Sequence, residues 1–241
     1  MKLIIIRHGD PDYSIDSLTD KGWKEAELLS KRIIQLNAKA FYVSPLGRAK
    51  DTASVTLKKL NKEAEVLPWL REFHAPIIDI RTGKNKVPWD WFPQDWTGVD
   101  TFYDMNGWHK APVMETAQVY DEAVKVYNGL DDILKRYGYE REGKIYKAIK
   151  PNRDTIVLFC HFGVECVMLA HLLGISPMLL WHGLCAAPTS VTTLITEERI
   201  EGIAYFRMSS FGDISHLYVA GEEPAFAARF CETYDNMEER H

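Results

Sequence analysis

The sequence predicts one α/β domain over residues 1–241, built as a three-layer α/β/α sandwich around a mostly parallel central sheet. Short aliphatic runs alternate with longer segments in which apolar residues recur every three or four positions, as in parallel strands joined by helices. The length of 241 residues is sufficient for a large core, and the 46% apolar and 26% charged fractions are ordinary for a globular protein. The elements below follow from these patterns.

The first strand–helix unit opens the chain. Residues 3–6 are consecutive aliphatics, as expected for a strand that helices cover on both faces. After a loop rich in turn formers, Thr19 is the predicted N-cap of a helix that runs to about Leu36. Its predicted apolar face comprises Trp23, Ala26, Leu29, Ile33 and Leu36.

A second unit repeats this order. Residues 40–43 are the predicted strand, and a helix begins close to Arg48. The apolar side of that helix is predicted to comprise Ala49, Ala53, Leu57 and Leu60. A third, shorter strand is predicted at residues 64–67.

Residues 74–115 depart from the repeating pattern. Trp89, Trp91, Trp96 and Trp108 lie among Pro, Gly and Asp without a strand or helix period. The abundance of aromatic residues argues against disorder, and a loop of this length is usually functional when it is folded. We therefore expect a folded, Trp-rich insertion, which either caps a site or forms a separate hydrophobic cluster.

The second half of the chain resumes the alternation. Thr116 is the predicted N-cap of a helix reaching about Tyr137, and the charged residues 138–153 are expected to form an exposed excursion. The clearest central strand is 155–160, and a helix follows at 164–173.

Two strands and a tail complete the predicted fold. Residues 190–196 and 203–208 are close enough in sequence to form an antiparallel hairpin. The last segment, 224–241, is predicted to hold a short helix and a frayed end.

Composition and charge exclude several classes of function. The apolar stretch 156–181 contains His161 and Glu165, which would be costly inside a membrane, so we interpret it as a strand followed by a helix. No signal-peptide pattern is present, and a net charge of −5 argues against a nucleic-acid or membrane-surface partner. Without CxxC spacing, the cysteines are expected to be reduced thiols of a cytoplasmic protein rather than metal ligands. They are Cys160, Cys166, Cys185 and Cys231.

Unusual polar residues stand where three predicted strands end. Arg7 and His8 follow the first strand, Arg48 the second, and His161 the strand at 155–160. Because the carboxyl ends of parallel strands share one sheet edge, these side chains can converge. Cations about 4 Å apart repel by about 4 kcal/mol at an effective dielectric constant of about 20, so such a cluster needs an anion.

A phosphoryl group suits this cluster. Arginine binds phosphate oxygens bidentately, and the helix starts after Gly9, Gly47 and Gly163 could add backbone N–H donors. One histidine could attack phosphorus while the other donors stabilise the equatorial oxygens, without a metal ion or a cofactor. The leaving alkoxide needs a proton, for which Glu72 is the first candidate.

Other assignments of the acid remain open at this point. Asp10, Asp12 and Glu165 are the alternative proton donors. Glu72 could also serve only as an ion-pair partner of Arg71 or Arg81.

The order of these motifs resembles the histidine phosphatase superfamily, whose fold is also called phosphoglycerate mutase-like. The similar segments are Arg7-His8-Gly9, Leu18-Thr19-Asp20-Lys21-Gly22, residues 44–53 (SPLGRAKDTA), Leu70-Arg71-Glu72, Glu115-Thr116 and Cys160-His161-Phe162-Gly163-Val164. The resemblance implies that His8 is the phosphorylated nucleophile and that Glu72 is the proton donor. It also implies that Arg7, Arg48 and His161 hold the phosphoryl group, with Gly9 letting the backbone approach the anion.

One departure from the family pattern bears on the reaction. Phe162 separates His161 from Gly163, whereas the family usually has His-Gly, and residues 162–164 lack the asparagine of cofactor-dependent mutases. Together with the aromatic insertion, this favours a phosphatase acting on a small phosphorylated substrate over a phosphoglycerate mutase. The third alternative is a catalytically silent phosphate- or partner-binding module. The sequence carries no signal for the oligomeric state.

Overall fold

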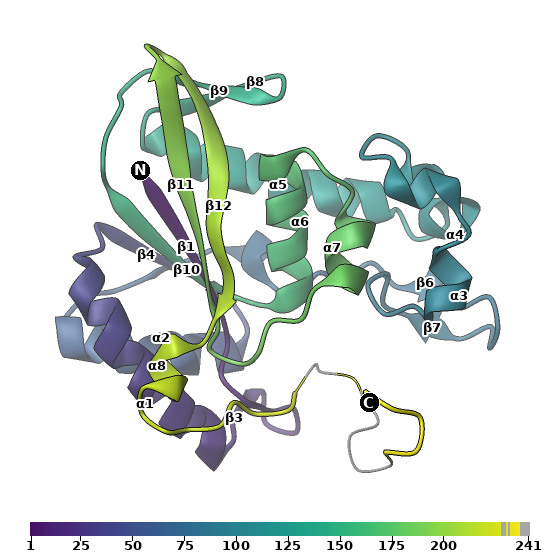
Figure 1. The fold of residues 1–241 in the computed structure, drawn as a ribbon, viewed down its shortest axis with the longest axis horizontal. Helices are drawn as coiled ribbons and strands as arrows, with labels where there is room; N and C mark the ends of the chain where they lie inside the picture. The colour runs from purple at the N-terminus through teal and green to yellow at the C-terminus, as the bar shows by residue number, and fades with distance from the viewer. Residues whose placement is uncertain (228–229, 231, 237–241) are drawn as a thin grey trace.

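The computed structural model describes residues 1–227, 230 and 232–236. Within them the chain forms a central eight-stranded sheet of order β5-β4-β10-β1-β11-β12-β9-β8 (Figure 1). Four adjacent strands are parallel: β1 (Lys2–Arg7), β4 (Ala40–Val43), β5 (Glu65–Val66) and β10 (Thr155–Cys160). The remaining strands run antiparallel to their neighbours: β11 (Val191–Ile200), β12 (Ile203–Asp213), β9 (Ile145–Ala148) and β8 (Tyr139–Glu142).

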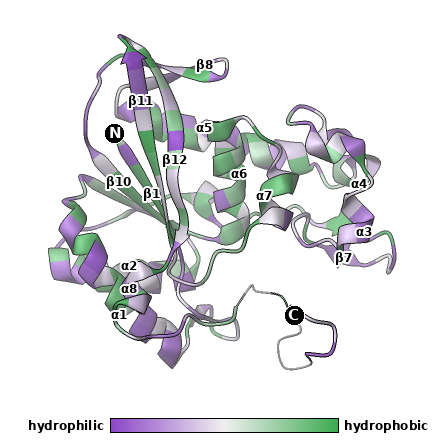
Figure 2. Ribbon diagram, in the orientation of Figure 1, coloured by the Kyte–Doolittle hydropathy of each residue, from purple (hydrophilic) through white to green (hydrophobic). Residues whose placement is uncertain are grey.

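Helices cover both faces of the sheet, which confirms the α/β class. One face carries α1 (Asp20–Ile33) and α2 (Gly47–Leu60), with α8 (Ser215–Tyr218) beside α1 (Figure 1). The other face carries α5 (Val119–Arg136), α6 (Phe162–Leu173) and α7 (Pro177–Gly183). The predicted 156–181 strand and helix are β10 and α6, and most of α6 is hydrophobic (Figure 2) because it is buried on nearly every side.

The first predicted helix has the expected start. Thr19 Oγ1 accepts a hydrogen bond from the amide of Gly22 at 3.0 Å, and α1 continues as a 3₁₀ turn, η1 (Ile34–Leu36). Ala26, Leu29 and Ile33 are buried, as predicted. Trp23 was wrongly predicted to lie on the same apolar face, since its side chain is 38% exposed.

The predicted N-cap at Thr116 is also wrong. Thr116 ends the short helix α4 (Pro112–Glu115), and α5 starts only after Gln118, whose φ of 52° interrupts the helical path. The apolar face of α5 is nevertheless buried, because a helix packed on a sheet is stabilised mainly by its packing and only weakly by its cap.

Residues 138–153 are a β-hairpin and not an exposed excursion. Strand β9 pairs with β12, so β8 and β9 extend the central sheet. Tyr139 and Tyr146 are almost fully buried, and the hydroxyl of Tyr146 donates to Asp131 Oδ1 at 2.7 Å. Each buried tyrosine is followed by a charged residue, Glu140 or Lys147, within a segment rich in charge, which hid the strand pattern.

The Trp-rich insertion is folded, as expected. It contains β6 (Ile77–Ile78), β7 (Asn85–Lys86), α3 (Pro93–Trp96), η3 (Asp100–Tyr103), η4 (Trp108–Lys110) and α4. Trp108 packs edge-on against Trp181 of α7, and Trp96 stacks on His182 with ring centroids 5.0 Å apart. These contacts fasten the insertion to α7.

The C-terminal prediction is only partly covered by the structure. Residues 224–227 are not helical, and residues 228–229, 231 and 237–241 lie outside the described part, including Cys231. The final strands β11 and β12 form the predicted antiparallel hairpin, although they are longer than the sequence pattern indicated. No helix of the described residues is long and apolar enough to cross a membrane.

Candidate active site

The carboxyl end of β1 delivers two buried polar side chains to the sheet edge. Arg7 is the last residue of β1 and pairs in register with Cys160 of β10. The amide of His8 donates to the carbonyl of Cys160 at 3.0 Å, which holds the imidazole where the strand ends. Arg7 and His8 are 3% and 2% exposed, so both are withdrawn from solvent.

The geometry fixes the tautomer of His8. Its Nδ1 lies 2.7 Å from the carbonyl oxygen of Gly9, and because a carbonyl oxygen only accepts, Nδ1 of a neutral ring carries the hydrogen. Nε2 is then the ring atom with the lone pair, which accepts a hydrogen bond from Arg48 Nε at 3.4 Å. Burial, followed by the charge of Arg7, places the pKa of His8 well below its usual value and keeps the ring neutral near pH 7.

Arg48 lies beside that lone pair, in the first turn of α2. Its Nε is 3.4 Å from His8 Nε2, and its Nη1 donates to Asp16 Oδ1 at 2.6 Å. The other carboxylate oxygen of Asp16 accepts from the amide of Gly47 at 2.7 Å. Sequence reasoning did not identify Asp16, because an aspartate in a loop gives no signal of which side chain it contacts.

His161 faces His8 from the start of α6. The two ring centroids are 5.0 Å apart, and His161 is completely buried. Its Nε2 lies 2.7 Å from the hydroxyl of Ser44, at the end of β4, while its Nδ1 has no hydrogen-bond partner among the described residues. The insertion of Phe162 after His161 therefore leaves the imidazole at the cluster.

Glu72 reaches the same helix start from the segment after η2 (Pro68–Leu70). Its Oε1 accepts from the amides of Phe73 and Val164 at 2.7 and 3.1 Å. Burial raises the pKa of Glu72, while these amides and the charge of Arg7 oppose the rise. An ideal Cβ on Gly163 would lie 2.6 Å from Oε1, so only glycine at this position lets the carboxyl approach α6.

Gly9 has a structural part in the cluster. Its amide donates to Thr52 Oγ1 at 2.9 Å, and an ideal Cβ on Gly9 would lie 2.9 Å from the carbonyl oxygen of Gly22. The absence of a side chain thus lets the first loop pack on α1, and the Gly9 carbonyl orients His8.

The arrangement of two histidines, two arginines and a carboxyl group at one sheet edge agrees with a comparison to protein families. A family model described as the histidine phosphatase superfamily (branch 1) matches residues 3–205. The chain belongs to the histidine phosphatase superfamily. The phosphatases and the mutase that are similar to this chain in sequence or fold all act on phosphoryl groups.

A phosphoglycerate mutase is similar to part of the sequence. A 2,3-bisphosphoglycerate-dependent phosphoglycerate mutase from Thermoplasma acidophilum is 34% identical over 93 residues, which cover 34% of this chain and 43% of the mutase. The match therefore spans less than half of that relative.

Solved structures share the fold at lower identity. A phosphoserine phosphatase from Entamoeba histolytica in complex with phosphoserine has a TM-score of 0.60 at 22% identity, covering 90% of this chain and 98% of that one. A mycobacterial glucosyl-3-phosphoglycerate phosphatase has a TM-score of 0.57 at 19% identity, covering 88% and 98% of the two chains.

The other candidate carboxylates have different surroundings. Asp10 Oδ2 accepts from the Thr19 hydroxyl at 2.7 Å, and Asp12 accepts from the amide of exposed Ser14 at 2.9 Å. Glu165 is completely buried within α6, where burial raises its pKa to about 7 and its Oε2 has no partner among the described residues.

The suggested ion pairs of Glu72 are absent from the described residues. Arg81 instead pairs with Asp95 at 2.6 Å, and Arg71 forms no ion pair with Glu72 there. Also within the described residues, no three His, Cys, Asp or Glu side chains gather in a way that could hold a metal ion.

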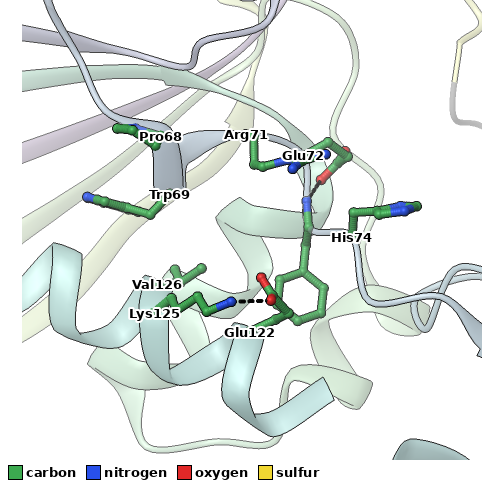
Figure 3. A pocket seen from close by; sticks show the side chains of 9 residues that line it. Pro68, Trp69, Arg71, Glu72, His74, Glu122, Lys125 and Val126 are labelled. Carbon is green, nitrogen blue, oxygen red and sulfur yellow. Dashed lines mark hydrogen bonds and ion pairs between the residues drawn. The ribbon is translucent and has the colours of Figure 1, made fainter. Parts of the chain in front are cut away.

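A cavity of about 330 Å³ adjoins the cluster without being part of it (Figure 3). It is lined by Pro68, Trp69, Arg71, Glu72, Phe73, His74, Glu122, Lys125 and Val126. Of the site residues only Glu72 borders it, and Figure 3 shows the Glu72 carboxyl turned away from Glu122 and Lys125, which pair with each other. The histidine and arginine cluster is therefore a separate feature at the sheet edge.

Proposed function

We propose that this protein hydrolyses small phosphomonoesters through a phosphohistidine formed on His8. The observation that carries the proposal is the neutral imidazole, whose Nδ1 donates to the Gly9 carbonyl and whose Nε2 lies beside Arg48. That arrangement supplies a nucleophilic lone pair next to a fixed positive charge.

The phosphoryl oxygens would be held by donors that the protein leaves unused. Arg7 Nη1 donates to the carbonyls of Ala186 and Ala227, but the buried Arg7 Nε has no partner among the described residues. If the Ser44 hydroxyl donates to His161 Nε2, the hydrogen of that neutral ring is on Nδ1, a second buried donor without a partner. Buried donors that lack acceptors are costly, and a bound phosphoryl group satisfies them.

The reaction proceeds in two displacements. Nε2 of His8 forms a bond to phosphorus as the ester P–O bond breaks, and protonated Glu72 gives its proton to the departing alkoxide. Water then attacks the phosphohistidine, Glu72 takes up a proton from that water, and the P–N bond breaks to release phosphate. The burial that raises the pKa of Glu72 favours the protonated form that the first step needs.

The proposal favours a phosphatase over a mutase. Phe162 and Val164 offer no polar side chain beside His161 to retain and reorient a bisphosphorylated intermediate. Incubation with 3-phosphoglycerate and a trace of 2,3-bisphosphoglycerate is therefore expected to release inorganic phosphate without producing 2-phosphoglycerate. Both products are measured by ³¹P NMR.

Either alternative would give a different spectrum. Formation of 2-phosphoglycerate faster than phosphate would establish a mutase. A silent binding module would release no phosphate from this ester or from an aryl phosphate.

A further inference from the structure

The indole of Trp89 and the carboxyl group of Glu72, the candidate proton donor, both lie close to Gly163. An ideal Cβ on Gly163 would lie 2.6 Å from Glu72 Oε1, 2.9 Å from Trp89 Nε1 and 3.1 Å from Trp89 Cδ1. Trp89 thus packs on the first turn of α6 beside the carboxyl group. Through Trp89 the Trp-rich insertion reaches the cluster.

Hydrogen bonds on both sides hold this indole in place. Trp89 Nε1 donates to the carbonyl of Phe73, the residue after Glu72, at 3.0 Å. Trp91 Nε1 donates to the carbonyl of Pro88 at 3.0 Å, and the amide of Trp91 donates to His182 Nε2 at 3.2 Å. The segment 88–91 is therefore anchored to the site loop and to α7, while Trp89 itself is only half-buried.

The position of Glu72 also locates the leaving group. A general acid must approach the oxygen that it protonates to within about 2.6–3.2 Å, so the ester oxygen has to lie against the Glu72 carboxyl. The first carbon atoms of the alcohol then come close to the indole that packs beside this carboxyl. A fixed, partly exposed aromatic ring favours contact with a flat apolar group.

We propose that Trp89 is a specificity-determining residue that forms a wall of the leaving-group subsite and selects phosphomonoesters whose alcohol carries a flat apolar ring. This inference rests on the proposed hydrolase function and adds the class of alcohol. It assigns the Trp-rich insertion a part in substrate choice.

The test compares benzyl phosphate with ethyl phosphate, two alkyl esters whose leaving alcohols have similar acidity. The wild-type protein is expected to prefer benzyl phosphate in kcat/KM. Trp89→Leu is expected to lower the benzyl-to-ethyl ratio about tenfold, the size of effect that one aromatic contact and its buried area produce. Trp89→Phe is expected to retain most of the preference.

Trp96→Leu is the matched control. Trp96 belongs to the same insertion and stacks on His182, so its loss perturbs the insertion without touching Glu72 or Gly163. The ratio in Trp96→Leu is expected to equal that of the wild-type protein. An equal ratio in Trp89→Leu, or an equal fall in both variants, would overturn the inference.

A second measurement does not depend on folding of the variants. Inhibition of the wild-type protein by benzylphosphonate is expected to be about tenfold stronger than by ethylphosphonate, and equal inhibition would contradict the role of Trp89. Absence of turnover of either ester by the wild-type protein would refute the hydrolase proposal itself. Turnover of both esters without preference would refute only the inference on Trp89.

Discussion

Replacing Arg48 by alanine is expected to lower kcat/KM for phosphomonoesters by about 10²–10³-fold, the usual cost of removing one donor that stabilises transition-state charge. In the proposed mechanism the guanidinium lies next to the phosphorus throughout the displacement, because its Nε is 3.4 Å from His8 Nε2. Steady-state hydrolysis of benzyl phosphate measures the effect. The loss should appear mainly in kcat, because the charge that Arg48 meets grows in the transition state.

Lys50→Ala is the control for this prediction. Lys50 lies two residues further along α2 and is exposed, so removing it changes the net charge equally without removing a donor from the cluster. Its kcat/KM should stay within about twofold of the wild-type value, since exposed charges contribute little. Equal losses in both variants would show that Arg48 acts through long-range charge and not as a phosphoryl ligand.

Glu72→Gln is expected to reduce hydrolysis of benzyl phosphate by about 10²–10⁴-fold, the range that general-acid catalysis supplies. The kcat/KM for p-nitrophenyl phosphate, which reports only the steps up to release of nitrophenolate, should fall far less, because nitrophenolate leaves without a proton. Glutamine keeps the size of the side chain and an oxygen that can accept from the Phe73 and Val164 amides. The ratio of the benzyl to the p-nitrophenyl phosphate rates therefore isolates the effect of proton donation by Glu72.

The pH dependence provides a second readout for Glu72. Because burial raises the pKa of Glu72, the protonated carboxyl persists to higher pH than in an exposed glutamate. In the wild-type protein, kcat/KM for benzyl phosphate should fall as the pH rises through that pKa. This descending limb of the pH profile should be missing in Glu72→Gln. Glu122→Gln, which removes the carboxylate paired with Lys125, should keep the limb. A uniform loss on both esters with an unchanged pH profile would exclude Glu72 as the proton donor.

The sequence predicted that Arg7, His8, Arg48 and His161 converge because each lies at the end of a buried strand or in the segment that follows one. The register of β1 with β10 brings Arg7 level with Cys160, so that His8 and His161 both follow at the same edge. Arg48 arrives there because β4 pairs in parallel with β10. Strand ends are determined by short-range hydrophobic patterns, which a sequence displays directly.

Other parts of the site depend on contacts that a sequence does not display. Asp16 fixes Arg48 through a loop in which its own φ is 48°, and nothing in the residues around it predicts that pairing. The need for glycine at 163 becomes visible only when Glu72 and Trp89 are seen to approach the same atom position. The hairpin formed by β8 and β9 was missed for a related reason, since its few buried residues, Tyr139, Tyr146 and Ala148, are spread through a charged segment.

The central claim is the phosphohistidine on His8, and intact-protein mass spectrometry after quenching in base tests it most directly. During turnover of p-nitrophenyl phosphate, the wild-type protein and His109→Ala should each carry one added phosphoryl group, because His109 lies in the insertion and stacks on Tyr120 of α5, away from His8. The group should map to the peptide that contains His8 and should be absent in His8→Ala. Turnover without any adduct, or an adduct that persists in His8→Ala, would contradict the mechanism.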